Sequence, residues 1–252
     1  MKDSLRHHKI QSWSSTMADV IKPLHNEVHK NFKIKNGFNT DLVKDQHLVP
    51  VVAHEFARVA NEYPIVFVKN NETGEFQPVA MLGLEPGENL FVKDGKWQAA
   101  YLPHALTRYP LVLSKNPENE EQLFVGINES SDLVGEDEGN ALFDEKGEET
   151  DYLKRRKEGL IAFVEFSQVT AAFTKFLADK ELLIPQTLTL EIKGEKRDIN
   201  GIYLIDEKKL NEMADDEFLE LRKRGYLPPI YSFLTSMPQV NRLARLKAEA
   251  ES

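Results

Sequence analysis

Several residue types and patterns that carry well-known chemistry are missing from this sequence of 252 residues. It has no cysteine, which excludes disulfides, thiolate metal sites and a cysteine nucleophile. It has neither Gly-x-Gly-x-x-Gly nor Gly-x-x-x-x-Gly-Lys-Ser/Thr, the glycine-rich patterns that hold nucleotide phosphates. The Gly-x-Ser-x-Gly turn of serine hydrolases is also missing. We therefore predict no catalytic residue and no cofactor.

Long apolar runs and a broad basic surface are missing as well. No apolar run approaches the roughly 20 residues that cross a bilayer, and no apolar segment of a secretory signal follows the basic N-terminus. We therefore expect no transmembrane segment and a cytoplasmic location. The formal charge is −9, and residues 116–151 hold thirteen Asp or Glu and one Lys. Nucleic-acid binding needs a basic face, so no nucleic-acid partner is expected.

The residues that are present have the composition of a soluble globular protein, with 41% apolar and 29% charged residues. The length suits one large domain or two small ones. Residues 1–22 are polar and lack periodicity, which indicates a flexible N-terminal arm. We expect a single domain over residues 23–252.

A repeated segment lies near the middle of the chain. An apolar run that begins at Tyr63-Pro64 is echoed 46 residues later by a run that begins at Tyr109-Pro110. Each copy continues through a polar turn into a second apolar run, which predicts two β-hairpins. A helix is predicted over residues 50–62, and Pro64 prevents it from continuing.

The predicted elements define an α+β fold. Its N-terminal half is rich in antiparallel β-hairpins (63–148), and it packs with a mainly helical half (150–252) that contains one further hairpin. Residues 23–37 fit a short helix or an irregular strand equally well. The other predicted elements are strands at 88–93, 96–100, 187–192 and 199–205, one or two helices from Thr150 to Pro185, and helices at 206–224 and 229–250, the last interrupted by Pro238.

Four residues are candidates for a binding site. Glu88 and Asn89 follow the turn Pro86-Gly87 and would present a carboxylate and an amide, although turn formation alone explains them better. Arg108 precedes the second Tyr-Pro pair and could bind an anion through two hydrogen bonds, or pair with an acidic residue. His47 completes the candidate set.

Two histidines are spaced so that they could bind a metal ion. His25 and His29 are four residues apart, a spacing that would place both on one face of a helix. With His47 and His54 they could form a three-histidine site. The pair does not complete the His-Glu-x-x-His pattern of metalloproteases. Ordinary polar histidines explain the spacing better, so no metal site is predicted.

Several segments, in order along the chain, resemble one known family. The run Tyr63-Pro64-Ile65-Val66-Phe67 and the segment 78–92 resemble the bacterial SapC family. Further similar segments lie at residues 101–103, 108–110, 127–129, 142–148, 201–207 and 224–227. The resemblance covers residues 24–246. His104 departs from it where a small residue is expected, and Asn128 where many members are acidic.

The resemblance implies a link to a paracrystalline bacterial surface layer associated with serum resistance. Similar proteins are often encoded beside flavin-dependent halogenase-like enzymes, cupin-like proteins and outer-membrane receptors, and no agreed catalytic residue comes with the family. The peptide-transporter permease of the same name is a different, membrane-spanning protein. We therefore expect a non-catalytic accessory or binding protein of a surface-layer or outer-membrane system, with a protein or small-molecule partner. The alternative is a small-molecule-binding enzyme or enzyme partner with a cleft between the β-rich and helical halves.

Overall fold

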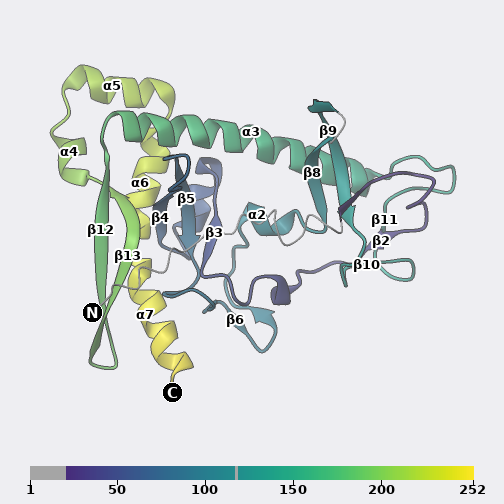
Figure 1. The fold of residues 1–252 in the computed structure, drawn as a ribbon, viewed down its shortest axis with the longest axis horizontal. Helices are drawn as coiled ribbons and strands as arrows, with labels where there is room; N and C mark the ends of the chain where they lie inside the picture. The colour runs from purple at the N-terminus through teal and green to yellow at the C-terminus, as the bar shows by residue number, and fades with distance from the viewer. Residues whose placement is uncertain (1–20, 117–118) are drawn as a thin grey trace. The chain divides into compact units, whose positions relative to one another are not determined.

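The computed structural model describes residues 21–116 and 119–252, which form a mixed α+β fold (Figure 1). The arm predicted for residues 1–22 lies outside the described residues except for its last two positions. The described chain divides into two compact units. Unit 1 contains residues 21–37 and Tyr109–Leu160, and unit 2 contains Phe38–Arg108 and Ile161–Ser252. The expected α+β class is confirmed.

Unit 2 is built on a five-stranded antiparallel sheet with the strand order β12-β13-β4-β5-β3. The strands are β3 (Leu48–Pro50), β4 (Ile65–Lys69), β5 (Phe76–Met81), β12 (Leu183–Ile192) and β13 (Glu195–Ile205). The β-branched and aromatic residues of β4 suit a strand with a partner on each side, and its first four residues are buried. The first copy of the repeat therefore forms the predicted hairpin, β4–β5.

The hairpin β12–β13 has a tight turn and a bulge. Lys193 and Gly194 have φ of 51° and 83°, as a two-residue type I′ turn requires. Gln186 pairs with Ile202, and two residues later Leu188 pairs with Ile199, three residues away on β13. Strand β13 therefore contains one extra residue. Gly201 supplies it with φ of 80°, a backbone conformation that glycine adopts at little cost.

Helices cover the sheet of unit 2. In α6 (Leu227–Ser236), Phe233 packs against Phe67 of β4 with ring centroids 5.5 Å apart. Val240 of α7 (Gln239–Ala250) packs with buried residues of β12. The remaining elements of this unit are η2 (Thr40–Leu42), η3 (Ala53–Glu55), α1 (Phe56–Val59), β6 (Val92–Lys93), β7 (Lys96–Trp97), α2 (His104–Thr107), α4 (Glu207–Asn211) and α5 (Asp215–Arg224).

The longest helix, α3 (Asp151–Asp179), contributes its residues up to Leu160 to unit 1 and the rest to unit 2. It is continuous through Gly159. Thr150 caps its N-terminus, because its hydroxyl oxygen accepts a hydrogen bond from the Leu153 amide at 3.3 Å. Farther along, the Thr170 hydroxyl donates to the Phe166 carbonyl four residues earlier, so it satisfies its own polar group inside the helix.

Unit 1 contains two small three-stranded sheets, ordered β1-β9-β8 and β10-β2-β11. Its strands are β1 (Ile21–Pro23), β2 (Lys33–Ile34), β8 (Leu111–Asn116), β9 (Asn119–Asn128), β10 (Val134–Gly135) and β11 (Asn140–Ala141). The second copy of the repeat forms the hairpin β8–β9, as predicted. Ile34, Leu111, Leu142 and Leu160 belong to one buried cluster, which is the core of this unit.

Two predicted helices are divided in the structure. Over residues 50–62, Pro50 ends strand β3, which pairs with β5, and only η3 and α1 are helical. The helix predicted over 206–224 consists of α4 and α5, while Gly225 ends α5 with φ of 73° as expected for a C-terminal glycine. The predicted interruption at Pro238 is confirmed, because Pro238 lies between α6 and α7.

Candidate functional site

Glu88 connects a turn to the last helix through hydrogen bonds and an ion pair. Its Oε1 accepts hydrogen bonds from the amides of Leu84 (2.7 Å) and Glu85 (3.2 Å), which closes the turn predicted at this point. Its Oε2 lies 2.7 Å from Nζ of Lys247, which also donates to Glu85 Oε1 at 2.6 Å. Burial opposes protonation of Lys247, but these hydrogen bonds raise its pKa overall. The carboxylate therefore fastens the turn to α7.

Asn89 and His47 lie in the same part of unit 2. The Asn89 amide is buried, donates to the Val43 carbonyl at 2.8 Å and accepts from the Phe91 amide at 2.9 Å. The His47 carbonyl accepts from the Gly83 amide at 3.1 Å. A Cβ atom at Gly83 would lie 2.6 Å from Cγ of Glu88. The structure thus gathers His47, Glu88 and Asn89 around Gly83, mainly through bonds that hold the loops together.

Arg108 lies in a different cluster, which is centred on a carboxylate that the sequence did not single out. Glu55 is 1% exposed. It accepts hydrogen bonds from the Val52 amide (3.0 Å), the Tyr101 hydroxyl (2.7 Å) and the His104 amide (2.9 Å). Such charge-assisted bonds compensate for the burial of an acidic group. We call Glu55, Tyr101, His104 and Arg108 the Glu55 cluster.

Burial shapes the electrostatics of the Glu55 cluster. It lowers the pKa of Arg108 to about 10, against the opposing attraction of Glu55. Burial first, and then the neighbouring Glu55 carboxylate, raise the pKa of the Tyr101 hydroxyl above its usual value. The Arg108 guanidinium carbon lies 3.8 Å from the ring centroid of Phe163 on α3, a cation–π contact. At neutral pH the cluster therefore joins one cation and a neutral phenol to a buried acidic side chain.

In the sequence, only the position of Glu55 relative to the predicted helix start could have indicated a structural role. It stands three residues after Val52 at the start of a helical segment, the place of the glutamate in a capping box. The Ser or Thr that marks a capping box is replaced by Val52, so the usual signal is missing. Tyr63, the first residue of the repeat, also reaches this region, where its hydroxyl donates to the Tyr101 carbonyl.

His25 and His29 do not lie together on one face of a helix. Residues 26–31 form turns, which leave His29 buried and His25 exposed. Nε2 of His29 lies 3.0 Å from Oε1 of Glu129, which also pairs with Lys22. In residues 21–116 and 119–252 no three His, Asp or Glu side chains are placed to hold a metal ion.

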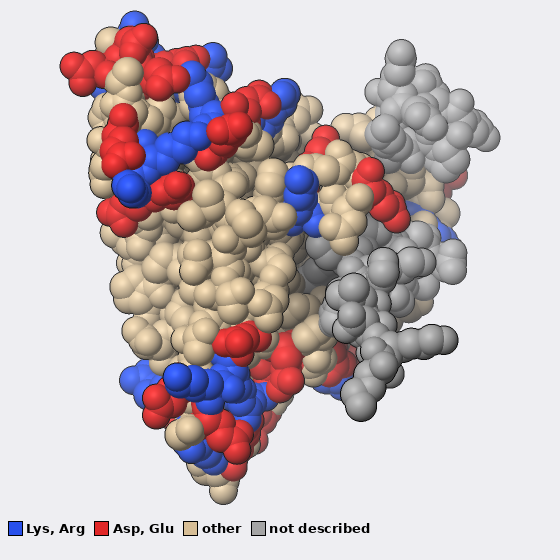
Figure 2. All heavy atoms as spheres, turned by 60° about the vertical axis from the view of Figure 1, so that its left-hand side comes forward, with Lys and Arg blue, Asp and Glu red and all other residues tan. Residues whose placement is uncertain are grey.

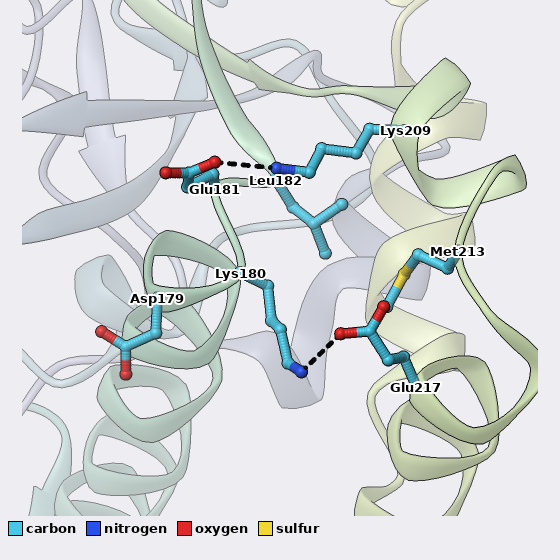
Figure 3. Close-up of a pocket in the computed structure, with 7 residues that line it drawn as sticks. All are labelled: Asp179, Lys180, Glu181, Leu182, Lys209, Met213 and Glu217. Carbon is cyan, nitrogen blue, oxygen red and sulfur yellow. Dashed lines mark hydrogen bonds and ion pairs between the residues drawn. The ribbon is translucent and has the colours of Figure 1, made fainter.

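A cavity of about 260 Å³ lies beside the C-terminal end of α3 in unit 2 (Figure 3). Its charged side chains are engaged with one another. Lys180 donates to Glu217 at 2.8 Å, and Lys209 donates to Glu181 at 3.1 Å. Figure 3 shows these two pairs on opposite sides of Leu182 and Met213. The ion pairs give the cavity little charge of one sign with which to attract a ligand.

The part of α3 in unit 2 exposes apolar side chains. Residues 161–174, which we call the apolar stretch of α3, contain Glu165 as their single charged residue. Ile161 is 51% and Val169 is 59% exposed. Among the described residues, α3 alone has the length and composition of a membrane span, with an 18-residue window of mean hydropathy 1.3. Only 28% of that window is buried, whereas a core helix is mostly buried. The stretch is therefore a surface feature.

A second uncharged surface lies on the hairpin β12–β13. Residues 182–190 and 199–205 contain no Asp, Glu, Lys or Arg. Figure 2 shows this side of the molecule, with charged side chains gathered at its two ends and a largely uncharged area between them. An uncharged centre with a charged rim is the pattern of protein interfaces.

These features describe an α+β protein with internally bonded polar clusters and two surfaces that carry little charge. Comparison with family models identifies it further: the SapC model matches residues 24–243. The chain belongs to the SapC family. No curated protein and no solved structure matches the chain.

Proposed function

We propose that this protein is a non-catalytic accessory protein that binds a protein partner of a bacterial surface-layer or outer-membrane system. The observation that carries the proposal is the apolar stretch of α3. Ile161 and Val169, about two turns apart on this helix, are both more than half exposed, and exposed apolar patches often mark contact sites. The stretch holds one charged residue, and charge depletion is typical of the centre of an interface. Membership of the SapC family supports the choice of system.

The polar candidates support binding more than catalysis. Glu88 is bonded to two amides and to Lys247, and Glu55 is bonded to three donors. A catalytic carboxylate must reach a substrate proton at hydrogen-bond distance. The oxygen atoms of these two carboxylates already accept hydrogen bonds from other groups of the protein. The exposed side chains of Ile161 and Val169 on α3 remain as the surface feature that a partner could cover.

The proposal is tested by capture of partners in the organism that encodes the protein. Tagged full-length protein would be cross-linked in cells and recovered, and the bound proteins identified by mass spectrometry. The same experiment with Val169→Glu places a charge in the middle of the apolar stretch. The matched control is Lys154→Glu, which places the same residue on an exposed position near the start of α3.

We expect the wild type and Lys154→Glu to recover the same envelope or receptor-associated proteins, and Val169→Glu to lose them. Equal recovery by all three chains would show that the apolar stretch is not the contact site. Recovery of metabolic enzymes alone, such as flavin-dependent halogenase-like proteins, would overturn the envelope proposal and support the alternative of an enzyme partner.

A further inference from the structure

The chain passes between the two compact units at three points, after Gly37, after Arg108 and after Leu160. We call these points the first, second and third connections. The third connection lies inside α3, where Leu160 belongs to the buried core of unit 1. Three residues later, Phe163 contacts Arg108 of unit 2. One turn of the helix, residues 159–163, therefore carries the third connection, and we call it the connecting turn.

The connecting turn begins with a glycine in the interior of a helix. Apart from proline, glycine is the least favourable residue at such a position, because its backbone loses the most freedom. Close packing against another element is one reason to find it there. Beyond the neighbouring residues of the helix, however, a Cβ atom at Gly159 would meet no described atom within 4 Å. Packing therefore gives no reason for a glycine at this position.

The side chains of the connecting turn hold it only weakly. Gly159 is exposed and has no side chain, and the Ile161 side chain is 51% exposed. Glycine leaves the helix backbone open to water, and a segment with few buried contacts and exposed backbone hydrogen bonds opens at low cost. Bending at this turn consequently uncovers little apolar surface.

The second connection is attached to α3 on both sides of Gly159. Within unit 1, the Arg156 guanidinium donates to the Tyr109 carbonyl at 3.1 Å. Within unit 2, the Arg108 guanidinium carbon lies 3.8 Å from the ring centroid of Phe163. Arg108 and Tyr109 are adjacent, and Gly159 lies between Arg156 and Phe163 in the helix. A bend at Gly159 thus leaves each contact inside its own unit.

The first connection also passes through a glycine. Gly37 has φ of 126°, a backbone conformation that glycine adopts readily and other residues rarely adopt. A Cβ atom there would meet no described atom within 4 Å. Two of the three connections therefore have a glycine with open surroundings at the point of passage or one residue before it.

We propose that the connecting turn of α3 is a hinge, about which unit 1 and unit 2 move as separate bodies. A hinge is a short segment that absorbs changes in backbone angles while the parts on either side keep their contacts. Gly159 supplies this freedom in the helix, and Gly37 supplies it in the first connection. The inference goes beyond the proposed function, because the motion needs no partner.

Distances between pairs of spin labels, measured by electron paramagnetic resonance, test the hinge. The chain has no native cysteine, so labels attach only at introduced ones. Glu145→Cys in unit 1 with Lys196→Cys in unit 2 reports on motion between the units. The reference pairs are Glu145→Cys with Lys154→Cys inside unit 1 and Lys196→Cys with Lys223→Cys inside unit 2. All four positions are exposed, and circular dichroism checks that each chain folds.

The perturbation is Gly159→Ala, which stiffens the connecting turn and for which the structure has room. Its matched control, Glu158→Ala, introduces the same residue one position earlier and keeps the glycine. We expect the distance distribution between the units to be wider than both reference distributions. Gly159→Ala should narrow it, and Glu158→Ala should leave it unchanged. Hydrogen exchange of the Phe163 amide, whose helical acceptor is the Gly159 carbonyl, should be about fivefold slower in Gly159→Ala.

Two results would overturn the proposal. A distribution between the units as narrow as the reference distributions would show that the two units form one rigid body. A wide distribution that Gly159→Ala leaves unchanged would place the motion in another segment, and equal exchange of the Phe163 amide in both chains would show the same. None of these results changes the partner capture that depends on Val169, so the hinge and the proposed function can fail separately.

Discussion

The buried carboxylate of Glu55 offers the sharpest test of how unit 2 is held together. Glu55→Gln keeps the size of the side chain and replaces one carboxylate oxygen with an amino group. The wild-type oxygens accept from three donors, the amides of Val52 and His104 and the hydroxyl of Tyr101. With Gln, at least one backbone amide must face an NH₂ group, and two donors cannot bond to each other.

The size of the effect follows from these contacts. A hydrogen bond to a charged group contributes about 1.5–3 kcal/mol, and a buried donor left without an acceptor costs about 1–3 kcal/mol. We therefore expect Glu55→Gln to lower the free energy of unfolding by about 3 kcal/mol. For a chain of this size that corresponds to a fall in Tm of roughly 6–12 °C. Tyr101→Phe removes one donor and leaves two, so it should cost about 1–2 kcal/mol.

Urea unfolding followed by circular dichroism measures these differences. Glu72→Gln is the control, because Glu72 lies in an exposed turn and its change should stay within about 0.5 kcal/mol of the wild type. The double variant of Glu55→Gln and Tyr101→Phe should cost less than the sum of the single variants, since both remove the same bond. If Glu55→Gln unfolds with the stability of the control, the carboxylate does not bear these hydrogen bonds and the account of the cluster is wrong.

Three further changes probe other parts of unit 2. Gly83→Ala should destabilise by about 1–3 kcal/mol through overpacking, since its Cβ would lie 2.6 Å from Cγ of Glu88; a thermal melt equal to that of the wild type would contradict this. Tyr63→Ala should cost about 3–5 kcal/mol in urea unfolding, because the ring is 0% exposed; a loss below about 1 kcal/mol would mean that the ring is not core. The hydrogen bond from Lys247 lowers the pKa of Glu85 below 4.5, so its contribution to stability is present above pH 4.5 and disappears as the pH falls through the folded pKa. Lys247→Met should therefore be further below the wild type at pH 7 than at pH 3, and a constant difference would contradict the ion pair.

Local sequence patterns correctly predicted the hairpins, whose strands are close together in the sequence. Both copies of the repeat form hairpins, and the further hairpin predicted in the helical half is β12–β13. The helix predicted over 50–62 was wrong at its start, because pairing of β3 with β5 draws Pro50 into the sheet; residues 53–59 are helical. That pairing joins residues about thirty positions apart, and a periodicity window cannot see it.

The candidate site shows the same limit. Glu88 and Asn89 were selected from a turn, and the structure places both in bonds that brace this turn. Arg108 was expected to bind an anion or to pair with an acidic residue. In the structure it is buried near Glu55 and Phe163, which come from distant segments of the chain. Glu55 itself carries no motif. Whether His47, Glu88, Asn89 or Arg108 binds a ligand stays a prediction.

The extra residue at Gly201 changes which residues of β13 share a face of the sheet. Ile199 lies opposite Leu188, and Ile202 lies opposite Gln186, two residues earlier on the same face of β12. Ile199 and Ile202 consequently share a face although they are three positions apart, where a regular strand would place them on opposite faces. Deleting Gly201 would straighten the ladder and leave every residue on its present face, because Ile199 and Ile202 would then be two positions apart. A gap at this position in a related sequence would therefore mark a hairpin that has lost its bulge and kept the side chains of both its faces.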